Sequence, residues 1–130
     1  MKIHMASVMV EDQDKALRFY TGMLGFELKQ DIPVGDARFL TVTSPDGPEG
    51  VELLLEPNSN PAVPAKEFQR SLYDAGIPWT SFGVDDIQSE YDRLTALGVS
   101  FTQVPTDLGD GITAAIFDDT CGNLIMIVEA

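Results

Sequence analysis

The sequence predicts an α+β fold of two βαβββ repeats, whose curled mixed sheets surround a cleft. Segments with strand-like composition surround one helix-like segment in each half of the chain. The order of these segments is the same in both halves. Corresponding residues lie 74 positions apart, as Val10 and Val84 show, and as Asp12 and Asp86 show again. A duplicated unit sets the architecture before any single motif is considered.

The first repeat unit is expected over residues 1–56. Residues 3–10 are rich in valine and methionine and contain no glycine or proline, which is typical of a strand. Asp12 is a suitable N-cap for the helix that follows, and Gly22 and Gly25 are suitable to end it. Three further strands are expected, beginning at Phe26 and covering residues 37–43 and 51–56.

Residues 57–78 are expected to join the two units. Three prolines and two asparagines in residues 57–64 are typical of a linker, and a short helix is predicted over 65–75. The second unit is expected over residues 79–130, with Asp86 capping its helix. Its strands are predicted at 79–84, about 99–104, 112–117 and 123–129.

Composition excludes several classes of function. The chain has 130 residues, which fits one domain made of the two repeats. Eight basic and 21 acidic residues give a net charge of −13, which argues against nucleic-acid and anionic-membrane partners. One cysteine allows no internal disulfide, and no apolar run approaches the roughly 20 residues of a membrane span. We therefore expect a cytoplasmic protein.

Six short motifs, taken in order, resemble one superfamily. They are VMVED (8–12), FY (19–20) and LGF (24–26) in the first half, and FGVDD (82–86), LGV (97–99) and GNLI (122–125) in the second. Together they are similar to the vicinal oxygen chelate (VOC) superfamily, which includes glyoxalase I, bleomycin-resistance proteins, fosfomycin-resistance enzymes and extradiol dioxygenases. The resemblance covers nearly the whole chain and implies the fold more strongly than it implies any activity.

The resemblance also implies where a metal would bind. Metal-dependent members hold a divalent ion through His and Glu side chains from the first and last strands of each unit, and the ion acts as a Lewis acid. The corresponding residues here are Met5, Glu52, Trp79 and Met126. A thioether is a soft ligand suited to Cu(I), and an indole offers a donor N–H rather than a lone pair. We therefore expect a metal-independent protein with no cofactor.

Two polar residues near these places each have two interpretations. His4, the only histidine, lies one residue before Met5, and an offset of one turns a strand side chain to the opposite face. We expect His4 to lie at the strand end rather than to bind metal, unless a bulge rescues it. Glu52 either faces a ligand as an acceptor or base, or is a solvated carboxylate. In an apolar cleft desolvation would raise its pKa, which suits proton transfer.

The candidate ligand site is soft and apolar. Met5, Ser7 and Met9 are expected to share one strand face, and Trp79 and Ser81 to share the equivalent face of the second unit. Methionines adapt to irregular ligands, and an indole ring can stack on a flat molecule or a cation. Simple core filling is the alternative. The candidate ligand-binding residues are Met5, Ser7, Met9, Glu52, Trp79, Ser81 and Met126.

Our leading hypothesis is a glyoxalase/bleomycin-resistance-type protein that binds a small amphipathic molecule and forms a homodimer. The acidic balance favours a cationic ligand at long range. The alternative is a VOC enzyme resembling lactoylglutathione lyases, isomerases or dioxygenases, with Glu52 as catalytic base or metal ligand. A third possibility is an interaction module whose cleft is filled by its own side chains. Cys121 lies in a predicted turn with no neighbouring base, so no thiol chemistry is expected.

Overall fold

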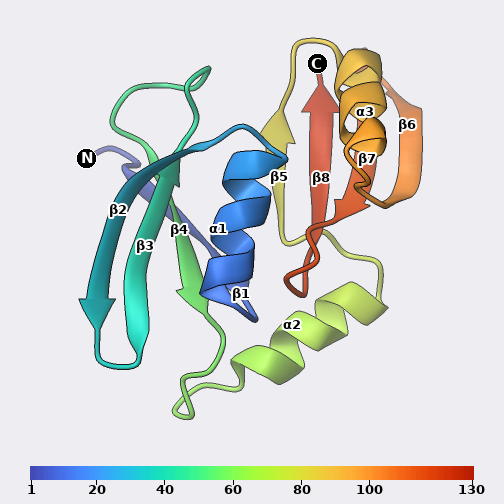
Figure 1. Cartoon of the computed structure of the whole chain (residues 1–130). Helices are drawn as coiled ribbons and strands as arrows, with labels where there is room; N and C mark the ends of the chain where they lie inside the picture. Colours follow the sequence, from blue (N-terminus) through green and yellow to red (C-terminus); the bar gives the residue numbers. More distant parts are fainter. The chain divides into compact units, whose positions relative to one another are not determined.

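The computed structural model describes residues 1–130 and divides into two compact units, Met1–Lys66 and Glu67–Ala130 (Figure 1). Each unit contains a four-stranded mixed sheet that stays open, which confirms the predicted α+β class. The first unit contains β1 (Met5–Val10), α1 (Gln13–Gly22), β2 (Glu27–Val34), β3 (Ala37–Thr43) and β4 (Glu52–Pro57). The second contains α2 (Ala65–Asp74, entering from the first unit), β5 (Thr80–Gly83), α3 (Ile87–Ala96), β6 (Phe101–Gly109), β7 (Ile112–Asp118) and β8 (Leu124–Glu129).

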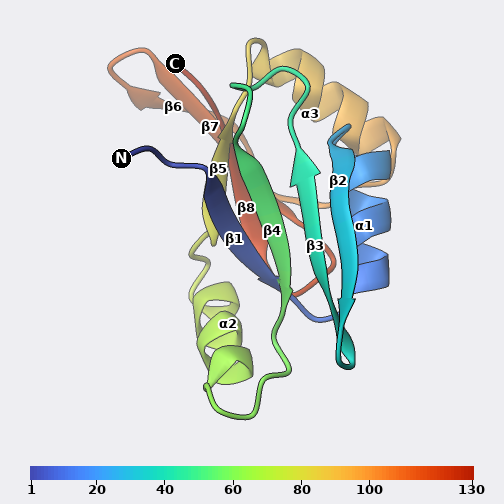
Figure 2. The same cartoon turned by 90° about the vertical axis from the view of Figure 1, so that its left-hand side faces the viewer.

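The first sheet has the strand order β1-β4-β3-β2 (Figure 2). Strands β1 and β4 run parallel, because α1 carries the chain from one strand toward the far edge, and the other pairs are antiparallel. Helix α1 packs on one face of the sheet. The core between them is apolar and closely packed. Its fully buried members are Val8, Val10, Ala16, Tyr20, Leu40, Val42 and Leu55.

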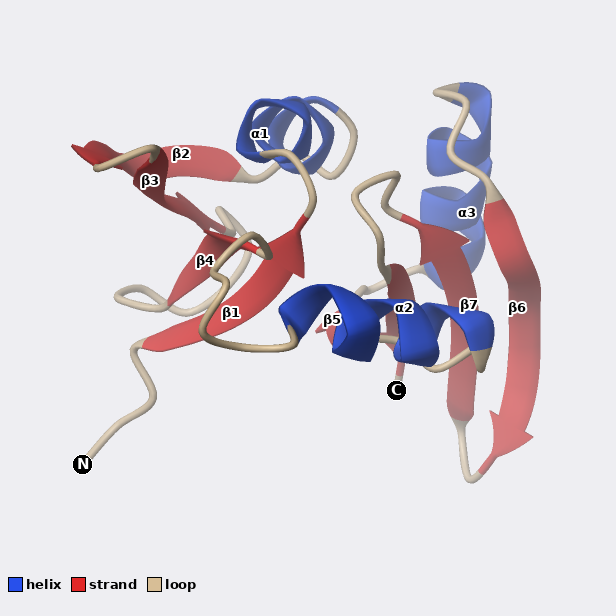
Figure 3. Cartoon of the chain, turned by 90° about the horizontal axis from the view of Figure 1, so that it is seen from below, coloured by secondary structure: helices blue, strands red, loops and turns tan.

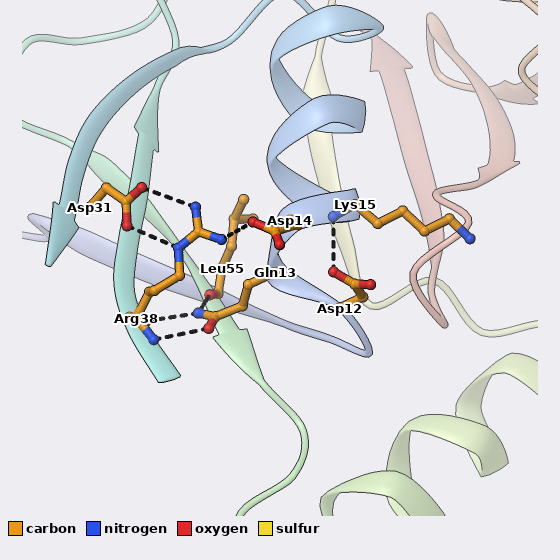
Figure 4. Close-up of polar contacts among 7 residues, drawn as sticks. All are labelled: Asp12, Gln13, Asp14, Lys15, Asp31, Arg38 and Leu55. Carbon is orange, nitrogen blue, oxygen red and sulfur yellow. Dashed lines mark hydrogen bonds and ion pairs between the residues drawn. The ribbon is translucent and has the colours of Figure 1, made fainter. Parts of the chain in front are cut away.

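The start of α1 is fixed by two sets of polar contacts. Asp12 caps the helix as predicted, its carboxylate accepting a bond of 3.0 Å from the backbone N–H of Lys15. The Gln13 side chain donates to the carbonyl oxygens of Arg38 (2.7 Å) and Leu55 (2.8 Å), and it accepts from the N–H of Arg38 at 3.0 Å (Figure 4). One side chain therefore ties the helix to both β3 and β4.

Arg38 adds an ionic contact beside this junction (Figure 4). Its guanidinium group donates two bonds to the Asp31 carboxylate, at 2.9 and 3.0 Å, and also pairs with Asp14 at the start of α1. The bond from Arg38 lowers the pKa of Asp31, outweighing the small opposing effect of burial. Arg38 therefore links β2 to the start of α1, and its single positive charge offsets one of the two carboxylate charges.

The second sheet has the order β5-β8-β7-β6, again with one parallel pair at its first edge. Helix α3 packs on one face of this sheet against β6, β7 and β8 (Figure 3). Asp86 caps α3, accepting a 3.0 Å bond from the N–H of Ser89, so the two units begin their helices in the same way. The buried apolar side chains of this unit include Ile87, Leu94, Ala115, Phe117, Ile125 and Ile127.

Helix α2 is joined to the β7–β8 connection by buried polar groups. The Asp119 carboxylate accepts bonds from the N–H groups of Cys121 (2.7 Å) and Asn123 (3.0 Å), and from the Asn123 side chain (2.8 Å). Asn123 in turn accepts a 3.0 Å bond from the Gln69 side chain on α2. Tyr73, one turn further on, donates a 2.5 Å bond to Asp118. The predicted linker helix is therefore an integral part of the second unit.

Several strand boundaries differ from the prediction, by one to five residues. The first strand begins at Met5 rather than at residue 3, so His4 lies just before it. β6 continues past Pro105 to Gly109, whereas a strand ending at 104 was expected. Proline is tolerated there because β6 is the edge strand, and the pairing with β7 is irregular between Gln103 and Thr106. None of the three helices combines the length and the apolar character that crossing a bilayer requires.

Candidate functional site

Strand register brings the predicted residues of the first unit onto one face. Met5 lies opposite Glu52 in the parallel β1–β4 pair, and Met9 lies opposite Glu56. Val8 and Val10 point to the α1 side, where they are fully buried. Alternation therefore puts Met5, Ser7, Met9 and Glu52 on the other face. We call this surface the first open face, and its residues include Met5, Ser7, Met9, Gln30, Phe39, Thr41, Thr43, Glu52, Leu54 and Glu56.

Glu52 is held by two neutral donors on this face. One carboxylate oxygen, Oε1, accepts bonds from the Gln30 side-chain amide (2.8 Å) and from the Thr41 hydroxyl (2.7 Å). These bonds lower the pKa of Glu52, first through Gln30 and then through Thr41. Partial burial acts in the opposite direction, and the charges of Lys29 and His4 make smaller contributions that lower the pKa further.

The expected rise in the pKa of Glu52 is therefore wrong in direction. Desolvation is present, but the two hydrogen bonds to the charged form outweigh it. A carboxylate with a lowered pKa stays ionised at neutral pH and is a poor proton acceptor there. The arrangement suits binding of a positive or hydrogen-bond-donating group better than proton abstraction.

Sequence analysis missed both partners of Glu52. Thr41 lies in the middle of a predicted strand, where a fully buried threonine gives no distinctive pattern. Gln30 is displaced by a bulge, because Leu28 pairs with Val42 while Gln30, not Lys29, pairs with Thr41. Counting alternate residues from the start of β2 would therefore have placed Lys29 beside Thr41. Only the pairing of β2 with β3 reveals which side chain reaches Glu52.

The second unit has a corresponding face. Ser81 lies opposite Met126, and the backbone N–H of Trp79 donates a 2.8 Å bond to the carbonyl of Leu124. Ile125 and Ile127 are buried with Phe117 on the α3 side of the sheet. We call the other side the second open face, and its residues include Trp79, Ser81, Ile116 and Met126. The predicted members of both units thus share faces within their own sheets.

The repeat is offset by two residues in β8. In the first unit Ser7 lies opposite Leu54, whereas in the second unit its counterpart Ser81 lies opposite Met126. The position equivalent to Glu52 is therefore Leu124, 72 residues later, rather than Met126 at a distance of 74. Met126 keeps the same face because an offset of two preserves strand alternation. The constant spacing of 74 residues between the repeats did not predict this offset, because no residue type marks it.

Trp79 has an aromatic partner that the sequence did not indicate. The ring of Phe68, on α2, lies 5.8 Å from the ring of Trp79, centroid to centroid, at an interplanar angle of 68°. This edge-to-face geometry is favourable for two aromatic rings. Phe68 remains 55% exposed and Trp79 is half-buried. The pair forms an aromatic corner in which an apolar ligand can make contact with either ring.

The side chains at the family's metal positions do not fit a divalent ion. At these positions the first unit offers one carboxylate and one thioether, Glu52 and Met5, and Oε1 of the carboxylate is already occupied by two donors. The corresponding residues of the second unit are Trp79 and Leu124. Within either unit, no three His, Cys, Asp or Glu side chains are grouped to hold a metal. His4 is exposed, and its carbonyl accepts the backbone N–H of Glu52 at 2.9 Å.

Comparison with known proteins decides the family. The model of the Glyoxalase/Bleomycin resistance protein/Dioxygenase superfamily matches residues 2–127. The chain belongs to this superfamily. The resemblance found in the short motifs is thereby confirmed. Among relatives of this glyoxalase-type protein, YurT of Bacillus subtilis (strain 168) is 56% identical over 129 residues, which is 99% of each chain.

Two solved structures of the superfamily are also similar over their whole length. The crystal structure of UcmS2 shares 31% identity with a TM-score of 0.85, and the match covers 100% of this chain and 98% of that one. TnmS3, described as an antibiotic binding protein from Streptomyces sp. CB03234, shares 26% identity with a TM-score of 0.77. That match covers 99% of this chain and 95% of TnmS3.

Proposed function

We propose that this glyoxalase-type protein binds a small amphipathic organic molecule and does so without the superfamily's metal ion. The observation that carries the proposal is the first open face. It combines soft apolar side chains, Met5 and Met9, with a carboxylate, Glu52, whose orientation two neutral donors fix. Ligand sites are mostly apolar and contain a few well-placed polar groups, which is the composition of this face.

Two further observations support binding over turnover. The printed description of TnmS3 is that of an antibiotic binding protein, and its similarity to this chain extends over nearly the whole length. The residues at the metal positions do not fit an ion, and the lowered pKa of Glu52 makes this carboxylate a weak base at neutral pH. The enzyme alternative with Glu52 as base therefore has no structural observation in its favour.

The proposal is tested with two planar dyes, the neutral Nile red and the cationic rhodamine 6G. We expect saturable binding with a fixed stoichiometry, measured by fluorescence anisotropy, and quenching of the single tryptophan, Trp79, when a dye contacts the second open face. Prior dialysis against EDTA should change neither affinity. If neither dye binds, or if binding disappears with EDTA and returns with a divalent metal, the proposed function is wrong.

We also propose that the protein is a homodimer, as the family resemblance implies, and that it is cytoplasmic, as its composition indicates. Native mass spectrometry of protein purified without chelator tests the assembly together with the ligand proposal. The expected spectrum shows twice the chain mass, with or without an organic adduct. A monomer at micromolar concentration would contradict the assembly, and one divalent ion per chain would contradict metal independence.

A further inference from the structure

We propose that Glu52, Gln30 and Thr41 form a recognition site for a protonated nitrogen of the ligand, an organic ammonium or guanidinium group. This inference rests on the proposed function and adds the charge class of the ligand to it. The site lies wholly within the first unit, since its three side chains come from the adjacent strands β4, β2 and β3.

The geometry of the Glu52 carboxylate leaves acceptor positions for an external donor. Both internal bonds, from Gln30 and from Thr41, end on the same oxygen, Oε1. An ionised carboxylate has about four acceptor positions on its two oxygens. Two donors on Oε1 fix the plane of the group, and the remaining acceptor positions, Oε2 above all, are left for an external donor. A carboxylate oriented in advance binds a donor with less loss of side-chain entropy than a mobile one.

Glu52 also lacks a positively charged partner within its own unit. Glu52 forms no ion pair. The bonds from Gln30 and Thr41 distinguish it from other unpaired carboxylates of the first unit, such as Glu56. Lys29 and His4 lower its pKa by Coulombic attraction without pairing with it. Glu52 is thus half-buried and kept ionised by neutral donors, with no internal counterion. An external cation supplies the missing charge, and a charge-assisted hydrogen bond is stronger than a neutral one.

The side chains around Glu52 favour an organic cation over a metal ion. Met5 lies directly opposite Glu52 on β1, and Leu54 follows it on the same face of β4. These side chains offer contact to the apolar body of a ligand whose nitrogen reaches Glu52. A hard divalent ion requires several oxygen or nitrogen ligands, and one carboxylate beside a thioether does not supply them. The expected ligand is therefore an amine, amidine or guanidine carried on an apolar skeleton.

The decisive experiment compares rhodamine 6G with Nile red on the wild type, E52Q and E49Q. Each variant loses one negative charge from the same unit, but Glu49 lies in an exposed loop before β4. At about 0.15 M salt, attraction beyond about 8 Å is largely screened. We expect E52Q to weaken rhodamine 6G about tenfold, the size expected for one charge-assisted hydrogen bond, and to leave Nile red unchanged. E49Q should bind both dyes as the wild type does.

Three outcomes overturn the inference while leaving the proposed function intact. Equal weakening by E52Q and E49Q would mean that only overall charge matters. Loss of both dyes in a folded E52Q would mean that Glu52 shapes the face rather than recognises charge. Unchanged rhodamine binding in E52Q would remove Glu52 from the site. If the wild type binds neither dye, the proposed function itself fails.

A measurement on the wild type covers the case in which E52Q does not fold. Carbon-13 labelled glutamate allows the side-chain carboxyl signals to be followed while benzylammonium is added, with benzyl alcohol as the neutral comparison. We expect the Glu52 signal to shift with a saturable dependence on benzylammonium and not on benzyl alcohol. The Glu49 signal should stay constant. A Glu52 signal that is indifferent to both compounds would contradict the inference.

Discussion

Glu52 shows how neighbouring side chains decide the chemistry of one carboxyl group. Residue type and an apolar setting predicted a raised pKa, but the amide of Gln30 and the hydroxyl of Thr41 reverse that shift. Both donors are uncharged, so they hold the carboxylate ionised without neutralising it. The difference between a base and an anionic recognition group therefore lies in two hydrogen bonds from adjacent strands.

Replacing Thr41 with valine should raise the pKa of Glu52 toward its ordinary value, because one of two bonds to the charged form disappears. The measurement is a pH titration of the Glu52 carboxyl signal by carbon-13 NMR. The matched control is T43V, since Thr43 lies on the same strand and face but makes no hydrogen bond to Glu52. An unchanged pKa in T41V, or an equal shift in T43V, would disprove the stated cause.

The same pKa shift has a defined effect on stability. The folded-state pKa of Glu52 lies below the ordinary 4.5, so its bonds stabilise the fold above that value. This contribution is lost as pH falls through the folded-state pKa, because the protonated group no longer favours the folded state. In T41V the loss should be smaller and should occur at higher pH, as acid unfolding followed by circular dichroism would show.

At the scale of elements, Gln13 is the side chain that attaches α1 to its sheet. Its amide makes three hydrogen bonds to backbone groups of β3 and β4, two of them to carbonyls of different strands. No local pattern predicts this role, because Gln13 follows the N-cap at a position where many polar residues are accepted. The helix start itself was predictable, since Asp12 and its bond to Lys15 involve residues three apart.

Q13A should lower the free energy of unfolding by about 1–3 kcal/mol, because half-buried backbone groups of Arg38 and Leu55 lose their partners. Urea denaturation monitored by circular dichroism measures the change. K15A is a suitable comparison, since the Lys15 side chain is exposed and its backbone bond to Asp12 remains. The K15A effect should stay within about 0.5 kcal/mol. Similar losses in both variants would show that Gln13 has no special role.

Pairing between distant strands was the part that the sequence could not predict. The two helix caps and most strand centres follow from local composition, and the structure confirms them. The bulge before Gln30 and the two-residue offset of β8 depend on which strands pair and in what register. They decide that Gln30 reaches Glu52 and that Met126 lies opposite Ser81. Residue types alone leave those choices open.

At the scale of the whole molecule, the repeat made the family recognisable although the individual motifs are short. The order, spacing and duplication of the motifs were enough to indicate the superfamily, which the match over residues 2–127 then confirmed. The class of ligand was harder to predict from the sequence, because it depends on a few side chains whose positions are set by the register of strand pairing. The acidic composition is a property of the entire chain and gives a separate expectation.

Raising the concentration of sodium chloride from low to physiological values should raise the melting temperature of the protein. A net charge of −13 disfavours the compact state through self-repulsion, and salt screens that repulsion. Differential scanning calorimetry at neutral pH measures the effect, and potassium chloride should reproduce it. A melting temperature that falls as salt is added would show that the internal ion pairs around Arg38 outweigh the repulsion.

The bulge in β2 also has a consequence for how this face can change by a single deletion. Because Lys29 is the extra residue of the bulge, the next residue, Gln30, pairs with Thr41 and places its uncharged amide there. A chain lacking Gln30 would restore regular pairing and bring Lys29 to that place, within reach of Glu52. The lysine ammonium would then occupy the carboxylate from inside the molecule. One inserted residue thus decides whether a neutral amide or the protein's own ammonium group lies beside Glu52.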